Sequence, residues 1–118
     1  MSISYSVNEL INKLNTLKKE IENETNKLLD DTLDVAETNM KLLAPVDTGY
    51  LRDNIEQNKT DKTIEVNCDY AIYQEHGTSQ FKPQPFFYPS INIAKNYVNK
   101  EFKLRINKAI KRSGLGWI

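Results

Sequence analysis

The sequence predicts an α+β fold, in which a long N-terminal helix and a C-terminal helix pack on a small antiparallel sheet. Three patterns predict it. Apolar residues recur every three or four positions over residues 7–43 and again over residues 91–109, and apolar and polar residues alternate over residues 64–70. The 118 residues suffice for one modest hydrophobic core, so we expect a single domain spanning residues 1–118.

The first helix is expected from about Ser6 to Leu43. Its apolar stripe comprises Val7, Leu10, Leu14, Leu17, Ile21, Leu29, Leu33, Ala36, Met40 and Leu43. Polar residues 24–26 interrupt this stripe, so the helix either bends there or runs on for about 55 Å. The phase shift across residues 21–29 breaks a strict heptad repeat. Two interpretations remain: the stripe covers the domain's own sheet, or it associates with helices of other subunits.

A turn and a hairpin are expected after the first helix. Pro45 ends the helix because proline cannot donate a backbone hydrogen bond, and Asp47 and Gly49 supply turn chemistry. Leu51 and Ile55 then face the core through a short helical turn or a strand. The polar loop at residues 58–62 joins this segment to the alternating strand, which predicts a hairpin.

The segment from Tyr70 to Thr78 predicts a helical turn that Gly77 ends. A loop rich in proline and aromatic residues follows, and it either folds back onto the core or docks on a neighbour. The candidate subunit interface comprises Phe81, Pro85, Phe86, Phe87, Pro89 and Trp117. For Trp117 a loose tail and a hydrophobic plug are both open.

The last helix begins at Pro89 or Ser90 and ends near Ser113 and Gly114. Its apolar stripe comprises Ile91, Ala94, Val98, Phe102, Ile106 and Ala109.

Charge is distributed unevenly although the net charge is zero. Residues 1–43 carry five Lys against eight acidic residues, residues 44–89 carry four basic against seven acidic, and residues 90–118 carry seven basic against Glu101 alone. A basic C-terminus can bind nucleic acid, a membrane surface or an acidic protein. The acidic N-terminal half offers a partner within the chain or on a neighbouring subunit, and part of the basic charge complements the helix dipole.

Cysteine content and hydropathy predict the cellular compartment in which the protein resides. Cys68 is the single cysteine, which excludes an intrachain disulfide, and it is expected to be a buried small hydrophobe. We expect no signal peptide, no membrane contact and a reducing cytoplasm, because no apolar stretch follows Met1 and none reaches about 18 residues.

The sequence predicts no metal site, no cofactor and no catalytic site. Cys68 and His76 are the only soft metal ligands, and the carboxylates show neither calcium-loop nor zinc spacing. His76 beside Glu75 could act as a general base, but no nucleophile or oxyanion site accompanies it. Two interpretations of Asp47, Arg52, Asp53 and Glu75 remain open: they are solvated charges, or Arg52 forms a bidentate pair with Glu75 that ties two turns together.

Three segments carry a resemblance to a known family. They are Pro-Val-Asp-Thr-Gly-x-Leu-Arg-x-x-Ile, Tyr-Ala-x-Tyr-x-Glu-x-Gly-Thr and Pro-Phe-Phe-x-Pro, in this order. Together they resemble the bacteriophage neck proteins typified by gene product ten of phage HK97, over about residues 40–95. The matching turn residues are Asp47, Thr48, Gly49, Leu51, Arg52, Tyr70, Tyr73, Glu75, Gly77 and Thr78. In the third segment Pro85, Phe86 and Pro89 match, while Tyr88 and Ser90 depart from the family pattern.

The resemblance implies a structural protein of a tailed phage or prophage rather than an enzyme. Such proteins join head to tail, or complete the tail, as a ring between the capsid connector and the tail tube. The implied partners are further copies of the chain and other neck and tail proteins, in the virion and, during assembly, in the host cytoplasm. Two other function classes remain open: a nucleic-acid-binding module using the basic C-terminal helix, and a small enzyme built around Asp47 or His76.

Overall fold

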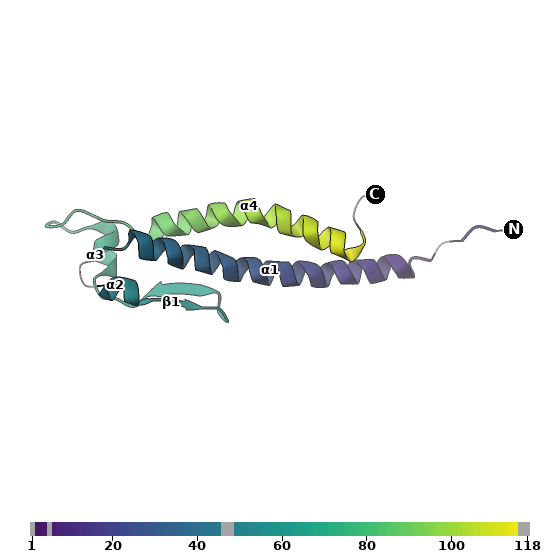
Figure 1. The fold of residues 1–118 in the computed structure, drawn as a ribbon, viewed down its shortest axis with the longest axis horizontal. Coiled ribbons are helices and arrows are strands. Elements are labelled where there is room, and N and C mark those ends of the chain that lie inside the picture. The colour runs from purple at the N-terminus through teal and green to yellow at the C-terminus, as the bar shows by residue number, and fades with distance from the viewer. Residues whose placement is uncertain (1, 5, 46–48, 116–118) are drawn as a thin grey trace. The chain divides into compact units, whose positions relative to one another are not determined.

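The computed structural model describes residues 2–4, 6–45 and 49–115, and its elements follow the predicted order (Figure 1). The helices are α1 (Asn8–Leu43), α2 (Tyr50–Asp53), α3 (Ala71–His76) and α4 (Phe87–Ser113), and the strands are β1 (Ile55–Asn58) and β2 (Thr63–Val66). The fold class is therefore α+β, as predicted. The chain divides into two compact units: unit 1 contains residues 1–28 and 100–118, and unit 2 contains residues 29–99.

In unit 2 a small core forms around the C-terminal part of α1. Ala36 and Met40 of α1 pack with Leu51 of α2, Ile55 of β1 and Phe86 before α4, and all are at most 4% exposed. These residues are apolar and converge from three elements and the segment before α4, so burying them supplies the driving force for this unit. The first turn of α4 runs alongside the last turns of α1 in Figure 1.

The two strands pair as an antiparallel hairpin in the register Ile55 with Val66, Glu56 with Glu65, Gln57 with Ile64 and Asn58 with Thr63. Ile64 and Val66 pack against the core while Glu56 and Glu65 are exposed. Polar side chains attach the hairpin to α1. Gln57 Nε2 donates to Asp34 Oδ1 at 3.1 Å and to Glu37 Oε2 at 2.7 Å.

Unit 1 contains the first half of α1 and the last half of α4. Arg112 Nη1 donates to Glu24 Oε1 at 2.6 Å and lies 3.6 Å from Glu20 Oε2. Glu24 is only 6% exposed; Leu28, four residues after it on α1, and Ala109, three residues before Arg112 on α4, are also buried. Glu24 therefore lies on the buried stripe, because it follows Ile21 by three positions and precedes Leu28 by four.

Several details of the predicted stripes are wrong. Leu28 rather than Leu29 is buried. Of the two possibilities left open for residues 24–26, the structure has one helix, α1, that continues through them. Leu43, Val7, Leu10 and Leu14 are 44%, 55%, 39% and 50% exposed. The strand β2 ends at Val66, four residues before Tyr70, because residues 69 and 70 form a turn. Phe102 is 51% exposed, and α4 begins at Phe87, two or three residues before the predicted start at Pro89 or Ser90.

Candidate functional site

The second and third motif segments meet at the carboxylate of Glu75. This side chain is 8% exposed and accepts hydrogen bonds from three consecutive backbone amides at the start of α4. Phe86 N and Phe87 N donate to Oε1 at 2.9 and 2.8 Å, and Tyr88 N donates to Oε2 at 3.0 Å. The first amides of a helix lack partners within it, and its dipole favours a negative charge there, so Glu75 caps α4.

Burial and hydrogen bonding act in opposite directions on the pKa of Glu75. Burial raises this pKa, but the hydrogen bonds from Phe87, Phe86 and Tyr88 lower it by more, and the neighbouring His76 lowers it slightly. The net effect is a pKa below the ordinary value, so Glu75 is ionised at neutral pH. Its oxygens are used by the helix terminus, which makes it a structural carboxylate.

The predicted ion pair between Arg52 and Glu75 is wrong, because the carboxylate of Glu75 bonds to the backbone of α4 instead. Both side chains belong to the described part of the chain, and the ion pairs found there do not join them. Arg52 is half-buried in α2, with a guanidinium nitrogen near Gly49.

Gly77 and Thr78 close the loop that connects α3 to α4. Gly77 has φ 75° and ψ 177°, and a Cβ on it would lie 2.8 Å from Pro83 Cδ. Only glycine fits this backbone and this space. Thr78 Oγ1 accepts from the backbone N–H of Gln80 and Phe81, and Gln84 N donates to Gln74 O at 2.8 Å. The loop is therefore shaped by its own backbone and tied at its base.

The first motif segment contributes Gly49, Tyr50 and Leu51. Gly49 has φ 73° and precedes α2, Leu51 is 2% exposed in the core, and the ring centroids of Tyr50 and Tyr70 are 6.2 Å apart. The predicted turn residues Asp47 and Thr48 lie outside the described residues, as does Trp117.

The candidate interface residues differ in where they lie. Phe86 is 1% exposed and belongs to the core, so its side chain is not on the surface where an interface would form. Phe87 is half-buried against the same core, whereas Phe81 is 70% exposed and Pro85 is exposed. The base of the loop thus folds back onto the core and its tip does not. Pro89 is partly buried in the first turn of α4.

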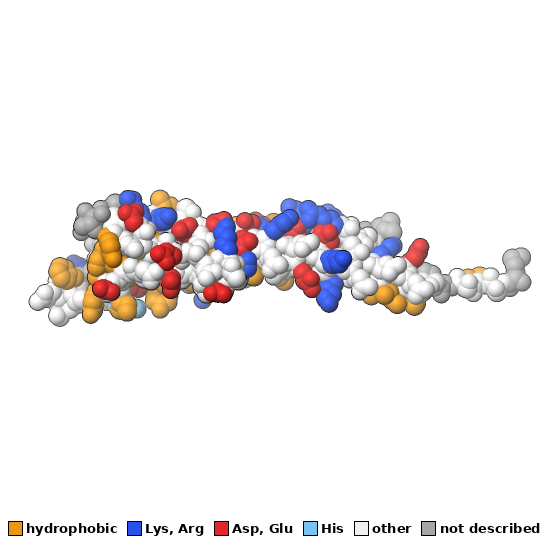
Figure 2. All heavy atoms as spheres, turned by 90° about the horizontal axis from the view of Figure 1, so that it is seen from below, with side chains coloured by type: hydrophobic (Ala, Val, Ile, Leu, Met, Phe, Trp, Pro, Cys, Tyr) orange, Lys and Arg blue, Asp and Glu red, His pale blue; other side chains and the backbone are white. Residues whose placement is uncertain are grey.

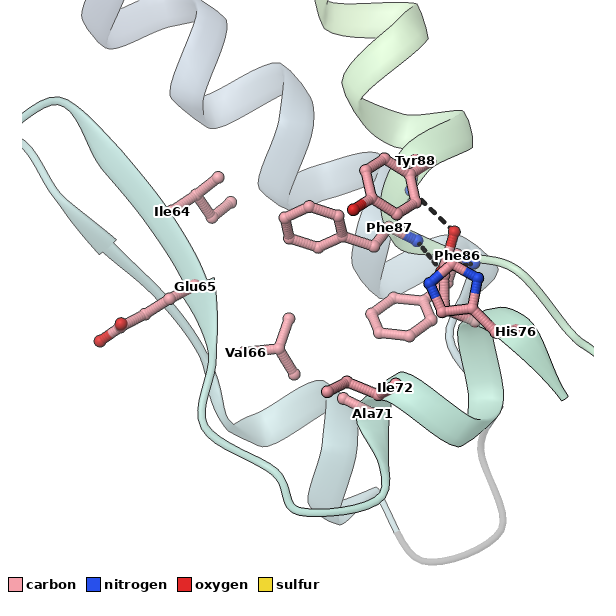
Figure 3. Close-up of a pocket in the computed structure, with 10 residues that line it drawn as sticks. Ile64, Glu65, Val66, Ala71, Ile72, His76, Phe86, Phe87 and Tyr88 are labelled. Carbon is pink, nitrogen blue, oxygen red and sulfur yellow. Dashed lines mark hydrogen bonds between the residues drawn. The ribbon is translucent and has the colours of Figure 1, made fainter. Parts of the chain in front are cut away.

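A hollow of about 280 Å³ lies beside this junction (Figure 3). Ile64 and Val66 of β2 point into it, while Glu65 points away. Phe87 and Tyr88 form another wall, and their rings meet edge to face with centroids 5.4 Å apart. The lining is mainly apolar, so it suits an apolar side chain better than a charged group.

The sequence did not reveal two of the structural residues found here. Ser90 is fully buried, and its Oγ donates to Phe86 O at 2.6 Å in the first turn of α4. Glu24 had a readable signal in its spacing from Ile21 and Leu28. Ser90 had none, since a serine near a predicted helix start is ordinarily exposed as a cap.

Three further properties of the described residues bear on function: metal ligation, membrane crossing and side-chain reactivity. No three His, Cys, Asp or Glu side chains among residues 2–4, 6–45 and 49–115 converge as metal ligands. Within the same residues, no helix has the length and hydropathy to cross a bilayer. Cys68 is a partly buried free thiol packed against the core, and His76 is exposed with its ring centroid 6.0 Å from that of Tyr88.

The family model described as "Bacteriophage HK97-gp10, putative tail-component" matches residues 8–77. The chain belongs to this HK97-gp10-like family. The resemblance inferred from the motif segments is thereby confirmed for the first two, while the third, at residues 85–89, follows the matched range. The family description makes this protein a component of a phage tail. No curated protein and no solved structure matches the chain at a significant level.

Proposed function

We propose that this protein is a structural subunit of the phage neck, where copies of it form a ring that joins the head to the tail or completes the tail. Membership of a family of tail components supports the general role. The observation that carries the specific role is the exposed apolar surface of unit 2, which is built on the rigid junction around Glu75.

This surface contains large side chains that a monomer would ordinarily bury. Phe81 is 70% exposed, Ile72 68%, Tyr73 59% and Tyr88 56%. They come from α3, the following loop and the start of α4, and Figure 2 shows hydrophobic side chains gathered at that end of unit 2. Exposed apolar patches of this kind mark protein interaction sites. The partners we propose are further copies of the chain and other neck and tail proteins.

The rigid junction suits a ring subunit. A closed ring requires each subunit to present two different faces at a fixed angle. We propose that Gly49, Gly77 and Glu75 set the angles between neighbouring elements of unit 2; the positive φ of both glycines and the hydrogen bond from Phe87 N to Glu75 support this. The location that follows is the neck of the virion, after assembly in the host cytoplasm.

Electron microscopy of purified protein, alone and with the neighbouring neck proteins, tests this function. Particles with cyclic symmetry are expected in at least one condition. Sedimentation that shows only a monomer in both conditions would contradict the proposal.

A second function is favoured by one observation. Lys100, Lys103, Lys108 and Lys111 are all exposed on α4 and could contact DNA. A DNA-binding module would show binding that weakens steeply as salt rises. Affinity that is independent of salt would dismiss this alternative.

A further inference from the structure

The two units have net charges of opposite sign. Unit 1 carries ten Lys and Arg against five Asp and Glu, and unit 2 carries six against eleven, so the net charges are +5 and −5. On the face drawn in Figure 2, Lys and Arg side chains gather over unit 1. Each unit is thus complementary in charge to the other unit of a second copy.

The acidic side of this pairing has a specific location on the hairpin. Glu56 and Glu65 are directly opposite each other across the strands, and both are exposed. Like charges in this position repel each other. The amide of Asn67 lies between them, with Nδ2 at 2.8 Å from Glu56 Oε2 and 3.5 Å from Glu65 Oε1. One neutral amide cannot balance two carboxylates.

The lysines of the hairpin turn do not balance this pair either. Lys59 forms an ion pair with Asp34 at 3.5 Å, and Lys62 forms one with Asp30. Both acidic partners belong to α1, so each lysine of the turn already has an acidic partner of its own. We call Glu56 and Glu65 the acidic hairpin face. Glu56, Glu65 and Asp61 border one polar hollow, which Lys59 also borders.

The basic side of the pairing lies on α4 in unit 1. At 100° per residue, Lys100, Lys103, Lys108 and Lys111 fall on the side of the helix opposite the buried Ala109. All four are exposed, and within the described part of the chain none forms an ion pair. Leu104, which is 57% exposed, lies among them. We call these four lysines the basic α4 face.

We propose that the acidic hairpin face of one copy binds the basic α4 face of a second copy. This inference rests on the proposed ring and names its subunit contact. Because the two faces differ and belong to different units, the contact is heterologous and repeats from copy to copy. The lysines then neutralise the opposed glutamates, and Leu104 contributes apolar contact at the centre.

Charge reversal tests the contact. The hairpin variant is Glu56→Lys with Glu65→Lys, and the α4 variant is Lys100→Glu with Lys103→Glu. Each alone is expected to weaken self-association about tenfold or more, measured by sedimentation velocity at low salt. An equimolar mixture of the two variants is expected to associate again, because the acidic α4 of one then meets the basic hairpin of the other. Circular dichroism verifies that each variant is folded.

A control matched to the hairpin variant carries the same change in net charge elsewhere. Glu9→Lys with Glu22→Lys alters two exposed residues of α1 and is expected to associate like the unchanged protein. If the wild type forms rings that neither variant disturbs, the contact is wrong and the ring proposal stands. If the wild type does not associate under any condition, both fail. If reversal on α4 abolishes only DNA retention, the lysines are a nucleic-acid surface and the inference is overturned.

Discussion

The carboxylate of Glu75 and the backbone amide of Phe87 are 2.8 Å apart, which joins α3 to the first turn of α4. Glu75→Gln should lower the free energy of unfolding by about 1–3 kcal/mol, because an amide retains one acceptor oxygen and no charge beside the helix dipole. Urea denaturation measures the loss. Glu65→Gln, on the exposed face of β2, is the control and should change stability by less than about 0.5 kcal/mol. Equal effects of the two substitutions would refute the capping role.

Glu75 also gives stability a pH dependence of known sign. Its pKa in the folded protein lies below the ordinary value of 4.5, so the folded state binds the proton less tightly than the unfolded state. The stabilisation is present above pH 4.5 and is lost as pH falls through the folded pKa. Denaturation series between neutral and acidic pH should show Glu75→Gln and wild type converging towards low pH. A constant gap would contradict the assignment.

Gly77→Ala should destabilise unit 2 by about 1–3 kcal/mol, since the new Cβ would be strained at φ 75° and would clash with Pro83. Gly114→Ala is a matched control. Gly114 also has positive φ, at 81°, but its nearest neighbours are side-chain carbons of Lys13 at 3.7 and 3.9 Å. Both substitutions strain the backbone at positive φ, but only Gly77→Ala also places a Cβ against Pro83. Comparing the melting temperatures of the two variants therefore isolates the cost of the contact with Pro83. A larger loss at Gly114 would show that the contact with Pro83 is unimportant.

Arg112→Met should destabilise unit 1 by about 1–3 kcal/mol, because it leaves the carboxylate of Glu24 buried without its cation. The half-exposed guanidinium keeps the effect in the lower part of that range. Adding Glu24→Met should recover much of the loss, as two apolar side chains replace an ion pair. A double-mutant cycle in urea gives the coupling. Additive losses would mean that the two side chains do not depend on each other.

Phe81 and Phe86 should respond in opposite ways to truncation. Phe81→Ser removes a side chain that is 70% exposed, so stability should change by less than about 0.5 kcal/mol while association weakens. Phe86→Ala should lower stability by about 3–5 kcal/mol, since the ring is in the core. Melting curves and sedimentation together check both expectations. Unchanged association of Phe81→Ser would remove the loop tip from the interface.

Much of the fold could be predicted from the sequence because local patterns determine it. The helical periodicities of residues 7–43 and 91–109, the polar hairpin loop and the helix end at Gly77 all follow from residues close in sequence. The errors arose where distant residues decide the outcome. The residues around Glu75 do not show that its carboxylate accepts hydrogen bonds from the backbone of Phe86 and Phe87, eleven and twelve positions later. Judged by charge alone, Arg52 was the favoured partner of Glu75.

Burial of the candidate site was harder to predict for a related reason. An aromatic residue in a proline-rich loop has the same sequence pattern whether it points inward, like Phe86, or outward, like Phe81. The difference depends on the hydrogen bonds between Glu75 and the backbone of residues 86–88. These bonds hold residues 86–88 against the core, whereas the tip of the loop, which contains Phe81, takes no part in them. Among the described motif residues, Gly49 and Gly77 have positive φ, and the contacts of Glu75 became visible only in three dimensions.

The loop between α3 and α4 is held at both ends by bonds that do not pass through its tip. Glu75 binds residues 86–88, and Gln84 N donates to Gln74 O. A peptide bond cut after Phe81 would therefore leave two fragments that remain fastened to each other through α3 and α4. The nicked protein would keep its core and lose only the continuity of the exposed tip. Limited digestion at this position would therefore show whether the intact tip is needed for association with other subunits, apart from its role in folding.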